Sequence, residues 1–383
     1  MALLSGETLS QVRRNTQHGH PQLTTADLLG GPLPGNLVEA KTASDVDVIW
    51  RSWIRRPVKI IDEYNRIPTK TQSALLSLMG EGYAEQFEQV LHAGASSWFL
   101  TANDDLGGGT FQVIDALKDR IDALVRAVPF ESSRLPLIAE RVTRNEQPEE
   151  LLPEDLRLGA NGLERATTEV RAVRIAQPVL DAMGAFAVQL EFCQRASDRL
   201  ERMTKDTLRV SGRRLGQVCN EDCPLDKREN LCSQSEFGLS TRAHYSWLRY
   251  AQALAWLEGR NEVAIEDLKA LAPWVLHERL RPNTQSGFFL DSAHKKLLSD
   301  RAEWITQLFE SALEHFHLHE EDRSVIDELR ARTPKDAREN RELREEALTL
   351  EQRLRDSREL TGLLHEDLLR LRAFVHHLNG LAS

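Results

Sequence analysis

A short apolar run that ends in two adjacent acidic residues places the strongest constraint on this fold. Residues 58–62 read VKIID, and Glu63 follows directly. A continuous apolar run of this length is typical of a strand that is buried on both faces of a parallel sheet. A second run of this kind, SSWFLTAN at 96–103, comes after the helical pattern TKTQSALLSLMGEG. This alternation of strand, helix and strand predicts an α/β architecture.

The chain changes character after residue 133. We expect residues 1–133 to form the α/β core and residues 134–282 to form an all-helical domain, because the second segment is periodic at helical spacing. A polar insertion that carries cysteines, at 213–236, interrupts the helical domain. Residues 283–383 are charged, and we expect them to form a helical extension.

A heptad seam runs through the last part of the chain, with alternating steps of four and three residues. Its members are Leu343, Ala347, Leu350, Leu354, Ser357, Thr361, Leu364, Leu368, Leu371, Val375 and Leu378. The spacing predicts a coiled coil or a long packed helix. The alternative is a solvated helical bundle whose only role is packing.

The two acidic residues at the end of the first strand suggest phosphate chemistry. An aspartate in this place can hold Mg²⁺, and a glutamate beside it can deprotonate a water molecule that attacks a γ-phosphate. The next strand run is followed by Asn103, whose side chain would reach the same water. The alternatives are solvated carboxylates at Asp62 and Glu63 and an ordinary turn residue at Asn103.

Two arginines are further candidates. Arg120 ends the helical pattern VIDALKDRID, and Arg242 lies at the start of a helix in FGLSTRAHYSWL. Arg120 would act as an arginine finger that reaches a nucleotide in a neighbouring subunit, or else would form a surface ion pair with Asp119 or Asp122. Arg242 would touch phosphates from the helical domain, or else would be an exposed residue of a capped helix.

Taken together, these motifs resemble one family. The stretch KIIDEYNRIPTKTQSALLSLMGEG, followed by FLTAND, ALKDRID and LSTRA, is similar to the MoxR family of AAA+ ATPases, in the clade with an insert in helix 2. The resemblance covers roughly residues 15–282, and DEYNRIPTKTQSALL is its most specific part. It implies an AAA+ core of the P-loop type with a parallel sheet, an all-helical lid, and here a helical, coiled-coil-like extension.

The resemblance also implies roles for single residues. Asp62 and Glu63 correspond to Walker B, with Asp62 helping to hold Mg²⁺ and Glu63 activating water. Asn103 corresponds to sensor 1, Arg120 to the arginine finger and Arg242 to sensor 2.

At the level of the whole protein, the resemblance implies ATP hydrolysis in a homo-oligomeric ring, a hexamer in most members. The family often remodels or activates a partner protein in the manner of a chaperone, beside a protein with a von Willebrand factor A domain. The glycine-bounded segment 82–94, which has the pattern of a hairpin or a short helix, would be the insert that contacts the client. The rival hypothesis is a non-hydrolysing adaptor that binds through its coiled coil.

One expected motif is missing from the sequence. A phosphate-binding loop needs the pattern G-x-x-x-x-G-K-[ST], and the 383 residues do not contain it. Either the sequence is an N-terminally shortened piece of a normal ATPase, or the subunit no longer binds ATP by itself. We favour the shortened ATPase because the other catalytic residues are present. We expect this chain alone to bind ATP weakly or not at all.

Three of the four cysteines lie close together in the polar insertion. Cys219, Cys223 and Cys232 occur in VCNEDCPLDKRENLC, and Cys193 precedes them on a predicted helix. Four thiolates suit a tetrahedral zinc ion or an iron–sulfur cluster, with zinc favoured. The spacing is not the common C-x₂-C, and the alternative is a loop with ordinary thiols. The family resemblance lends no support to a metal here.

Charge and hydropathy narrow the classes of function. The formal net charge of −10 gives no overall attraction to nucleic acid, although a local basic patch remains compatible with it. No apolar run approaches the roughly 18–20 residues that a membrane helix needs. The N-terminal residues lack a basic segment ahead of an apolar one, so we expect no signal peptide. Four cysteines in 383 residues do not form a typical disulfide scaffold, so we expect a reducing, cytoplasmic location.

Overall fold

The computed structural model describes residues 8–94, 96–103, 109–127, 131–146, 162–193, 195–196, 203–219, 223, 231–355 and 361–381. The chain forms two compact units. Unit 1 comprises Met1–Ile121 and Val125–Ala172, and unit 2 comprises Asp122–Leu124 and Val173–Ser383. No helix in the described ranges is long and apolar enough to cross a membrane.

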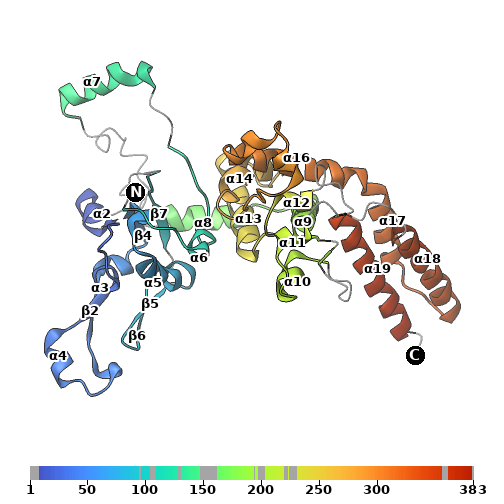
Figure 1. Cartoon of the computed structure of the whole chain (residues 1–383), viewed down its shortest axis with the longest axis horizontal. Coiled ribbons are helices and arrows are strands. Elements are labelled where there is room, and N and C mark those ends of the chain that lie inside the picture. The colour runs from blue at the N-terminus through green and yellow to red at the C-terminus, as the bar shows by residue number, and fades with distance from the viewer. Residues whose placement is uncertain are drawn as a thin grey trace. The chain divides into compact units, whose positions relative to one another are not determined.

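Unit 1 contains strands and short helices, labelled in Figure 1. Its elements are α2 (Leu9–Asn15), β1 (Gln17–His18), α3 (Thr25–Leu29), β2 (Gly30–Pro32), α4 (Pro34–Glu39), η1 (Ala43–Asp45), β3 (Val48–Trp50), η2 (Ser52–Arg55), β4 (Val58–Asp62), η3 (Tyr64–Arg66), α5 (Thr69–Gly80), β5 (Tyr83–Gln86), β6 (Gln89–His92), β7 (Ser97–Leu100), α6 (Asp115–Lys118), η4 (Ser132–Arg134), α7 (Leu135–Arg144) and α8 (Gly162–Ala172).

The parallel sheet of unit 1 confirms the predicted α/β core. Strands β1, β4 and β7 pair in the order β1-β4-β7, and both pairings are parallel. Ile61 on β4 is fully buried and packs in one cluster with Leu75 and Leu78 of α5. Because parallel strands end at the same edge of a sheet, the residues that follow β4 and β7 meet there.

The segment between the two glycines 82 and 94 is a β-hairpin. Strands β5 and β6 pair antiparallel, and Phe87 and Glu88 between them both have positive φ, 50° and 60°. Two successive left-handed residues are the geometry of a type I′ turn, which matches the twist of the flanking strands. Of the two forms that the sequence allowed, hairpin or short helix, the structure has the hairpin.

Unit 2 is helical in its described residues. Its elements are α9 (Gln177–Glu191), α10 (Lys205–Val210), α11 (Leu215–Val218), α12 (Leu231–Gln234), α13 (Thr241–Leu257), α14 (Ile265–Val275), α15 (Gly287–Leu290), η7 (Lys295–Leu298), α16 (Arg301–Leu318), α17 (Glu320–Ala331), α18 (Ala337–Arg355) and α19 (Gly362–Leu381).

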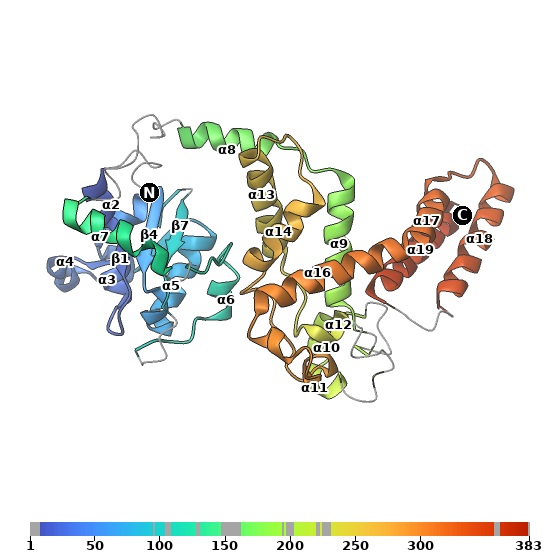
Figure 2. The ribbon, with the colours of Figure 1, turned by 90° about the horizontal axis from the view of Figure 1, so that it is seen from above.

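Aromatic side chains form the centre of unit 2. Phe186 of α9, Trp247 of α13 and Phe309 of α16 are fully buried, and each ring lies edge-to-face with the other two at centroid distances of 5.3–5.6 Å. Pairs of this geometry contribute roughly 0.5–1.5 kcal/mol each beyond their buried area. Helix α16 packs against both α9 and α14 (Figure 2). The core of unit 2 therefore includes α16, which lies in residues 283–383, the segment expected from the sequence to form the helical extension.

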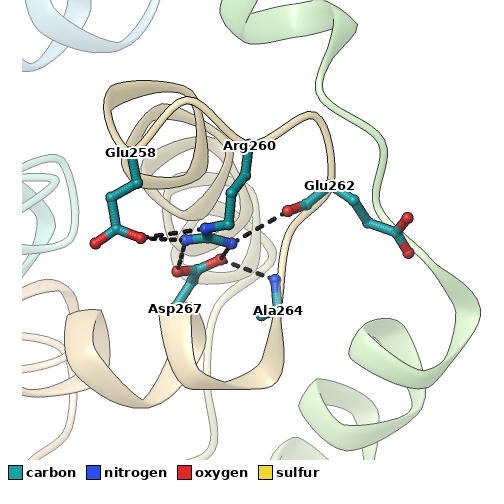
Figure 3. A network of polar contacts seen from close by, with 5 residues as sticks. All are labelled: Glu258, Arg260, Glu262, Ala264 and Asp267. Atoms are coloured by element: carbon teal, nitrogen blue, oxygen red, sulfur yellow. Dashed lines mark hydrogen bonds and ion pairs between the residues drawn. The ribbon is translucent and has the colours of Figure 1, made fainter.

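A polar network fixes the turn between α13 and α14 (Figure 3). Arg260 donates to both carboxylate oxygens of Asp267, at 2.8 and 2.5 Å, and to Oε2 of Glu258 at 2.6 Å. Asp267 is 4% exposed and also accepts from the backbone N–H of Ala264 at 2.8 Å. Bidentate bonds of this kind hold both helix ends in one orientation.

The predicted heptad seam lies on two helices. Helices α18 and α19 run antiparallel, since Asn340 donates to the backbone oxygen of Leu378 and Arg372 donates to Glu351. The buried seam residues that pack together are Leu343, Ala347, Leu350, Leu354, Leu364, Leu368, Leu371 and Leu378. Ser357 of the predicted seam lies outside the described residues. The seam residues therefore form the buried interface between two antiparallel helices, α18 and α19.

Candidate functional site

The two carboxylates at the end of β4 sit at a backbone irregularity. Asp62 is the last residue of the strand, and Glu63 adopts a left-handed conformation with φ 54° and ψ 46°. A residue with a side chain rarely adopts this conformation, which costs on the order of 1–3 kcal/mol and is often associated with functional sites. The turn ends the strand abruptly at the edge where the parallel strands finish.

Asn103 reaches the same point from the end of β7. Its Nδ2 donates to Oε1 of Glu63 at 2.8 Å, and its backbone oxygen accepts from Nδ2 of Asn65 at 2.9 Å. The side chain of Asn103 is therefore held against Glu63 although the two residues are 40 positions apart in the chain. The sequence motifs predicted these three residues, and the structure brings Asp62, Glu63 and Asn103 together.

Thr101 connects the pair, and the motif analysis did not single it out. Its hydroxyl donates to Oδ1 of Asp62 and accepts the backbone N–H of Glu63 at 3.0 Å. Thr101 lies two residues before Asn103 in FLTAND, and alternate residues of an extended chain point to the same side. That alternation was the signal that could have identified it.

Two nitrogen-bearing side chains flank the carboxylates. His18 Nδ1 lies 3.4 Å from Oδ2 of Asp62, and Arg66 Nε lies 3.4 Å from Oε2 of Glu63. Sequence reasoning missed both residues. His18 is directly opposite Asp62 in the register of β1 and β4, so only the strand pairing reveals it. Arg66 lies three residues after Glu63 on the short helix η3, where such a contact is common.

The chain approaches itself closely beside these residues. Gly19 donates its backbone N–H to the backbone oxygen of Asp62 at 2.7 Å. A Cβ atom at position 19 would lie 2.2 Å from the backbone oxygen of Glu63. Only glycine fits there without a shift of one of the two segments.

The arrangement offers oxygen atoms suitable for Mg²⁺. The carboxylate of Asp62 has 45% of its side-chain surface exposed, and the Thr101 hydroxyl lies against it. Mg²⁺ prefers one or two carboxylates together with water and substrate oxygens, and this donor set fits that preference. The described residues contain no group of three or more His, Cys, Asp or Glu arranged to hold a metal ion.

Arg120 makes other contacts. Its NH1 donates to the backbone oxygen of Ala116 at 3.0 Å, and its guanidinium packs on Gly80, where an added Cβ would lie 2.6 Å from Nε. Within the described part of the chain, the buried Nε has no hydrogen-bond partner. This position is at the C-terminal end of α5, and Arg120 is not part of the hydrogen-bond network of Asp62 and Glu63.

Arg242 belongs to unit 2. It is exposed and is the second residue of α13, whose N-cap is Ser240. The Ser240 hydroxyl accepts from the backbone N–H of Ala243 at 3.1 Å. The capped helix start fits both hypotheses made for Arg242, the phosphate contact and the exposed arginine.

The four cysteines come from different elements of unit 2, and none forms a disulfide. Cys193 follows α9, Cys219 follows α11, Cys232 lies in α12, and Cys223 lies between the last two. Burial raises the pKa of the Cys232 thiol to about 12, and the charges of the other three thiols contribute to that rise. The fold therefore brings the predicted set into one region.

Comparisons with known proteins agree with this architecture. A family model described as the AAA lid domain matches residues 227–292. The crystal structure of a candidate ATPase from Cytophaga hutchinsonii is similar, with a TM-score of 0.50 and 20% sequence identity over 78% of this chain and 76% of the other. At that identity the likeness concerns the fold alone. No curated protein sequence matches the chain. An α/β core followed by a helical lid is the AAA+ architecture.

Proposed function

We propose that this AAA+ protein hydrolyses ATP, with Glu63 as the residue that activates water. The observation that carries the proposal is the hydrogen bond of 2.8 Å between Asn103 and Glu63 at the shared edge of two parallel strands. It brings together a carboxylate that can accept a proton and an amide that can orient it. The AAA lid match supports the same class of protein.

The chemistry assigns a distinct task to each side chain. Glu63 accepts a proton from the water that attacks the γ-phosphate, and a positioned general base contributes typically 10²–10⁴-fold to such a step. Asn103 holds the Glu63 carboxylate in place. Asp62, fixed by the Thr101 hydroxyl, would hold Mg²⁺ directly or through water. Bound Mg²⁺ supplies the positive charge that offsets the charge on the phosphates.

The phosphate contacts need a further element. The 383 residues contain no G-x-x-x-x-G-K-[ST] pattern, so the backbone cradle and lysine that bind the β- and γ-phosphates are not among them. We expect this polypeptide alone to bind ATP weakly or not at all. A submicromolar dissociation constant for ATP, measured by calorimetry on this polypeptide, would contradict that expectation.

The finer part of the proposal follows the MoxR resemblance. Arg120 would act in trans on a nucleotide held by a neighbouring subunit of a hexameric ring, and Arg242 would contact phosphates from the lid. In apo subunits the guanidinium of Arg120 would rest on Gly80 and be released on assembly.

The ring would remodel or activate a partner protein in the cytoplasm, for which a von Willebrand factor A domain protein is the expected class. The hairpin β5–β6 would meet the client, because its turn leaves Phe87 39% exposed and Val90 50% exposed. Exposed apolar side chains at a hairpin tip suit contact with an unfolded or partly folded segment.

The substitution Glu63→Gln in the natural protein, isolated from its source cells, tests the proposal. We expect assembly to persist and steady-state ATP hydrolysis to fall by about 10²–10⁴-fold, because the amide cannot accept the proton. Glu164→Gln, an exposed carboxylate on α8, is the matched control and should leave hydrolysis unchanged. Unchanged hydrolysis in Glu63→Gln would overturn the proposal.

A second function has one observation in its favour. Without a phosphate-loop sequence, the AAA+ core would serve only as a scaffold, and the packed helices α17–α19 would bind a partner. This adaptor hypothesis predicts that Glu63→Gln changes neither assembly nor any cellular activity of the protein. Loss of activity with retained assembly favours the enzyme.

A further inference from the structure

All four cysteines of the chain are gathered in one part of the lid. They come from the end of α9, the end of α11, the segment after it, and α12. Electrostatic interactions link the thiol of Cys232 to the other three thiols and to the amine of Lys205. The sequence places Cys193 at least 26 residues from the others, so the fold itself produces this convergence.

Packing and hydrogen bonds tie the same positions together. Cys193 packs against a small buried cluster that contains Val218, the residue before Cys219. Asn283 Nδ2 lies 3.9 Å from the sulfur of Cys219 and donates at 3.0 Å to the backbone oxygen of Ser233, the residue after Cys232. Helix α12 packs on α9. These contacts bring together the segments that carry Cys193, Cys219 and Cys232.

A buried lysine lies among the thiols. Lys205 is 3% exposed, and its Nζ donates to the backbone oxygen of Ser235 at 2.6 Å and to the Ser235 hydroxyl at 2.9 Å. Both acceptors are neutral. Burial lowers the pKa of the Lys205 amine to about 8, and the neighbouring thiols of Cys232, Cys193 and Cys219 act against that fall. A buried ammonium group is costly unless negative charge compensates it, and deprotonated thiols would supply that charge.

We propose that the lid binds one metal centre through four thiolates, those of Cys193, Cys219, Cys223 and Cys232, with the ammonium group of Lys205 as the compensating charge. Four thiolates around Zn²⁺, or around a [4Fe–4S]²⁺ cluster, carry two negative charges in total. Lys205 offsets one of them inside the protein. Binding releases the four thiol protons to solvent, and no oxidation or reduction of the cysteines is involved.

Metal binding would complete an arrangement that is only partly formed. Among the described residues no ligand set is in place, so the sulfur atoms must draw together, to about 2.3 Å from a zinc ion. The site would then link α11 and α12 to the end of α9. Helix α13, which carries Arg242, begins nine residues after Cys232. This inference does not depend on ATP hydrolysis.

The first test measures metal in the full chain, purified without chelator from cells grown with zinc and iron. Mass spectrometry of the elements should give about one zinc per chain or, for a cluster, about four irons with acid-labile sulfide and visible absorption. Either result supports the four-thiolate site and identifies its metal. Less than about 0.2 equivalent of both metals overturns it.

The second test uses substitutions. Cys223→Ser, outside the regular helices, should lose the metal while far-ultraviolet circular dichroism shows the helices retained. Val210→Ala, at an exposed position on α10, is the control and should keep full metal content. Full metal content in Cys223→Ser would overturn the proposal, since the metal would then be held elsewhere.

A chemical test on the unaltered chain gives a result that does not depend on whether the variant folds. In the metal-loaded protein the four thiols should resist a thiol reagent, and all four should react after a strong chelator removes the metal. Four thiols that react equally fast before and after chelation would overturn the proposal as well.

Discussion

At the scale of single residues, the Thr101 hydroxyl is the atom that joins the two carboxylates of the candidate site. It donates to Asp62 and accepts the backbone N–H of Glu63. Thr101→Val keeps the shape of the side chain but removes both hydrogen bonds, so we expect ATP hydrolysis by the natural protein to fall at least about 10-fold.

Thermal unfolding serves as the companion measurement for Thr101→Val, and we expect the unfolding temperature to drop by only a few degrees. Thr167→Val, on the exposed face of α8, is the control. Hydrolysis at the unaltered rate in Thr101→Val would mean that the hydroxyl does not position the acidic pair.

Gly19 gives a prediction about stability at the same place. In Gly19→Ala the new Cβ would lie 2.2 Å from a backbone oxygen, so one of the two segments must move. We expect the free energy of unfolding of the α/β core to fall by about 1–3 kcal/mol, measured by chemical denaturation.

Gly35→Ala is the matched control, because nothing lies within 4 Å of a Cβ atom there. If the two alanine variants were equally stable, the close approach of Gly19 to Glu63 would be refuted.

The sequence predicted Asp62, Glu63 and Asn103 because each follows an apolar run that forms a strand of the parallel sheet. The burial predicted for the second run was wrong, because β7 is an edge strand of the described sheet and its Phe99 is 44% exposed. The sequence did not identify His18 as a residue of the site, because the partner of His18 depends on the register between β1 and β4. Strand pairing is a tertiary property, and no local pattern around His18 indicates it.

At the scale of elements, the turn between α13 and α14 depends on Asp267. Burial alone would raise the pKa of this carboxyl, but hydrogen bonds from Arg260 and from the Ala264 N–H lower it below its usual value. A lowered pKa means that the stability from this group is present above the unfolded-state pKa of about 4 and is lost as pH falls through the native value.

Asp267→Asn should therefore lower the free energy of unfolding of the lid by about 1–3 kcal/mol at pH 7, and by less at pH 3. Thermal unfolding at the two pH values measures this difference. Asp206→Asn is the control, because its ion pair with Arg209 is on an exposed side chain. An equal effect at both pH values would contradict the assigned role.

Helix α19 contains a carboxyl group whose contribution to stability depends on pH in the opposite direction to that of Asp267. Asp367 is 2% exposed, its Oδ2 has no hydrogen-bond partner among the described residues, and burial raises its pKa to about 6. Positive charge on Arg323 and Arg370 lowers the pKa of Asp367 and so opposes the effect of burial. Negative charge on Asp327 and Glu366 raises it further. A raised pKa means that stability is complete below about pH 4 and is lost as pH increases through about 6.

Asp367→Asn should consequently stabilise the C-terminal helices by about 1–3 kcal/mol at pH 8 and have little effect at pH 4. Thermal unfolding followed at both pH values provides the measurement, with Glu345→Gln, at an exposed position on α18, as the control. A variant that is less stable than the natural sequence at pH 8 would refute the assignment.

The heptad seam illustrates what periodicity can and cannot predict. It identified the residues that α18 and α19 bury, but a continuous register does not indicate where a helix ends. Within the described residues, α18 ends at Arg355 and α19 begins at Gly362, directly after the polar seam member Thr361. A seam interrupted by small polar residues is compatible with a hairpin, because the same apolar stripe can pack on itself.

At the scale of the whole molecule, one chain combines an α/β core with a helical unit whose residues 227–292 match the AAA lid domain model. The order of strands, helices and lid could be predicted because buried strands and helical periodicity are local patterns. The sequence could not predict that the four cysteines lie in one region, because their proximity depends on the packing of α9 and α12. The proposed metal would stabilise the lid, and the proposed catalysis belongs to the core, so the two proposals can fail separately.

The central claim is that Glu63 is the group that activates water for ATP hydrolysis. A single-turnover measurement on the natural protein tests it most directly, because it separates ATP binding from the chemical step. With ATP bound, Glu63→Gln should release phosphate at least about 100-fold more slowly than the unaltered protein. Phosphate release at the same rate in both proteins would contradict the account.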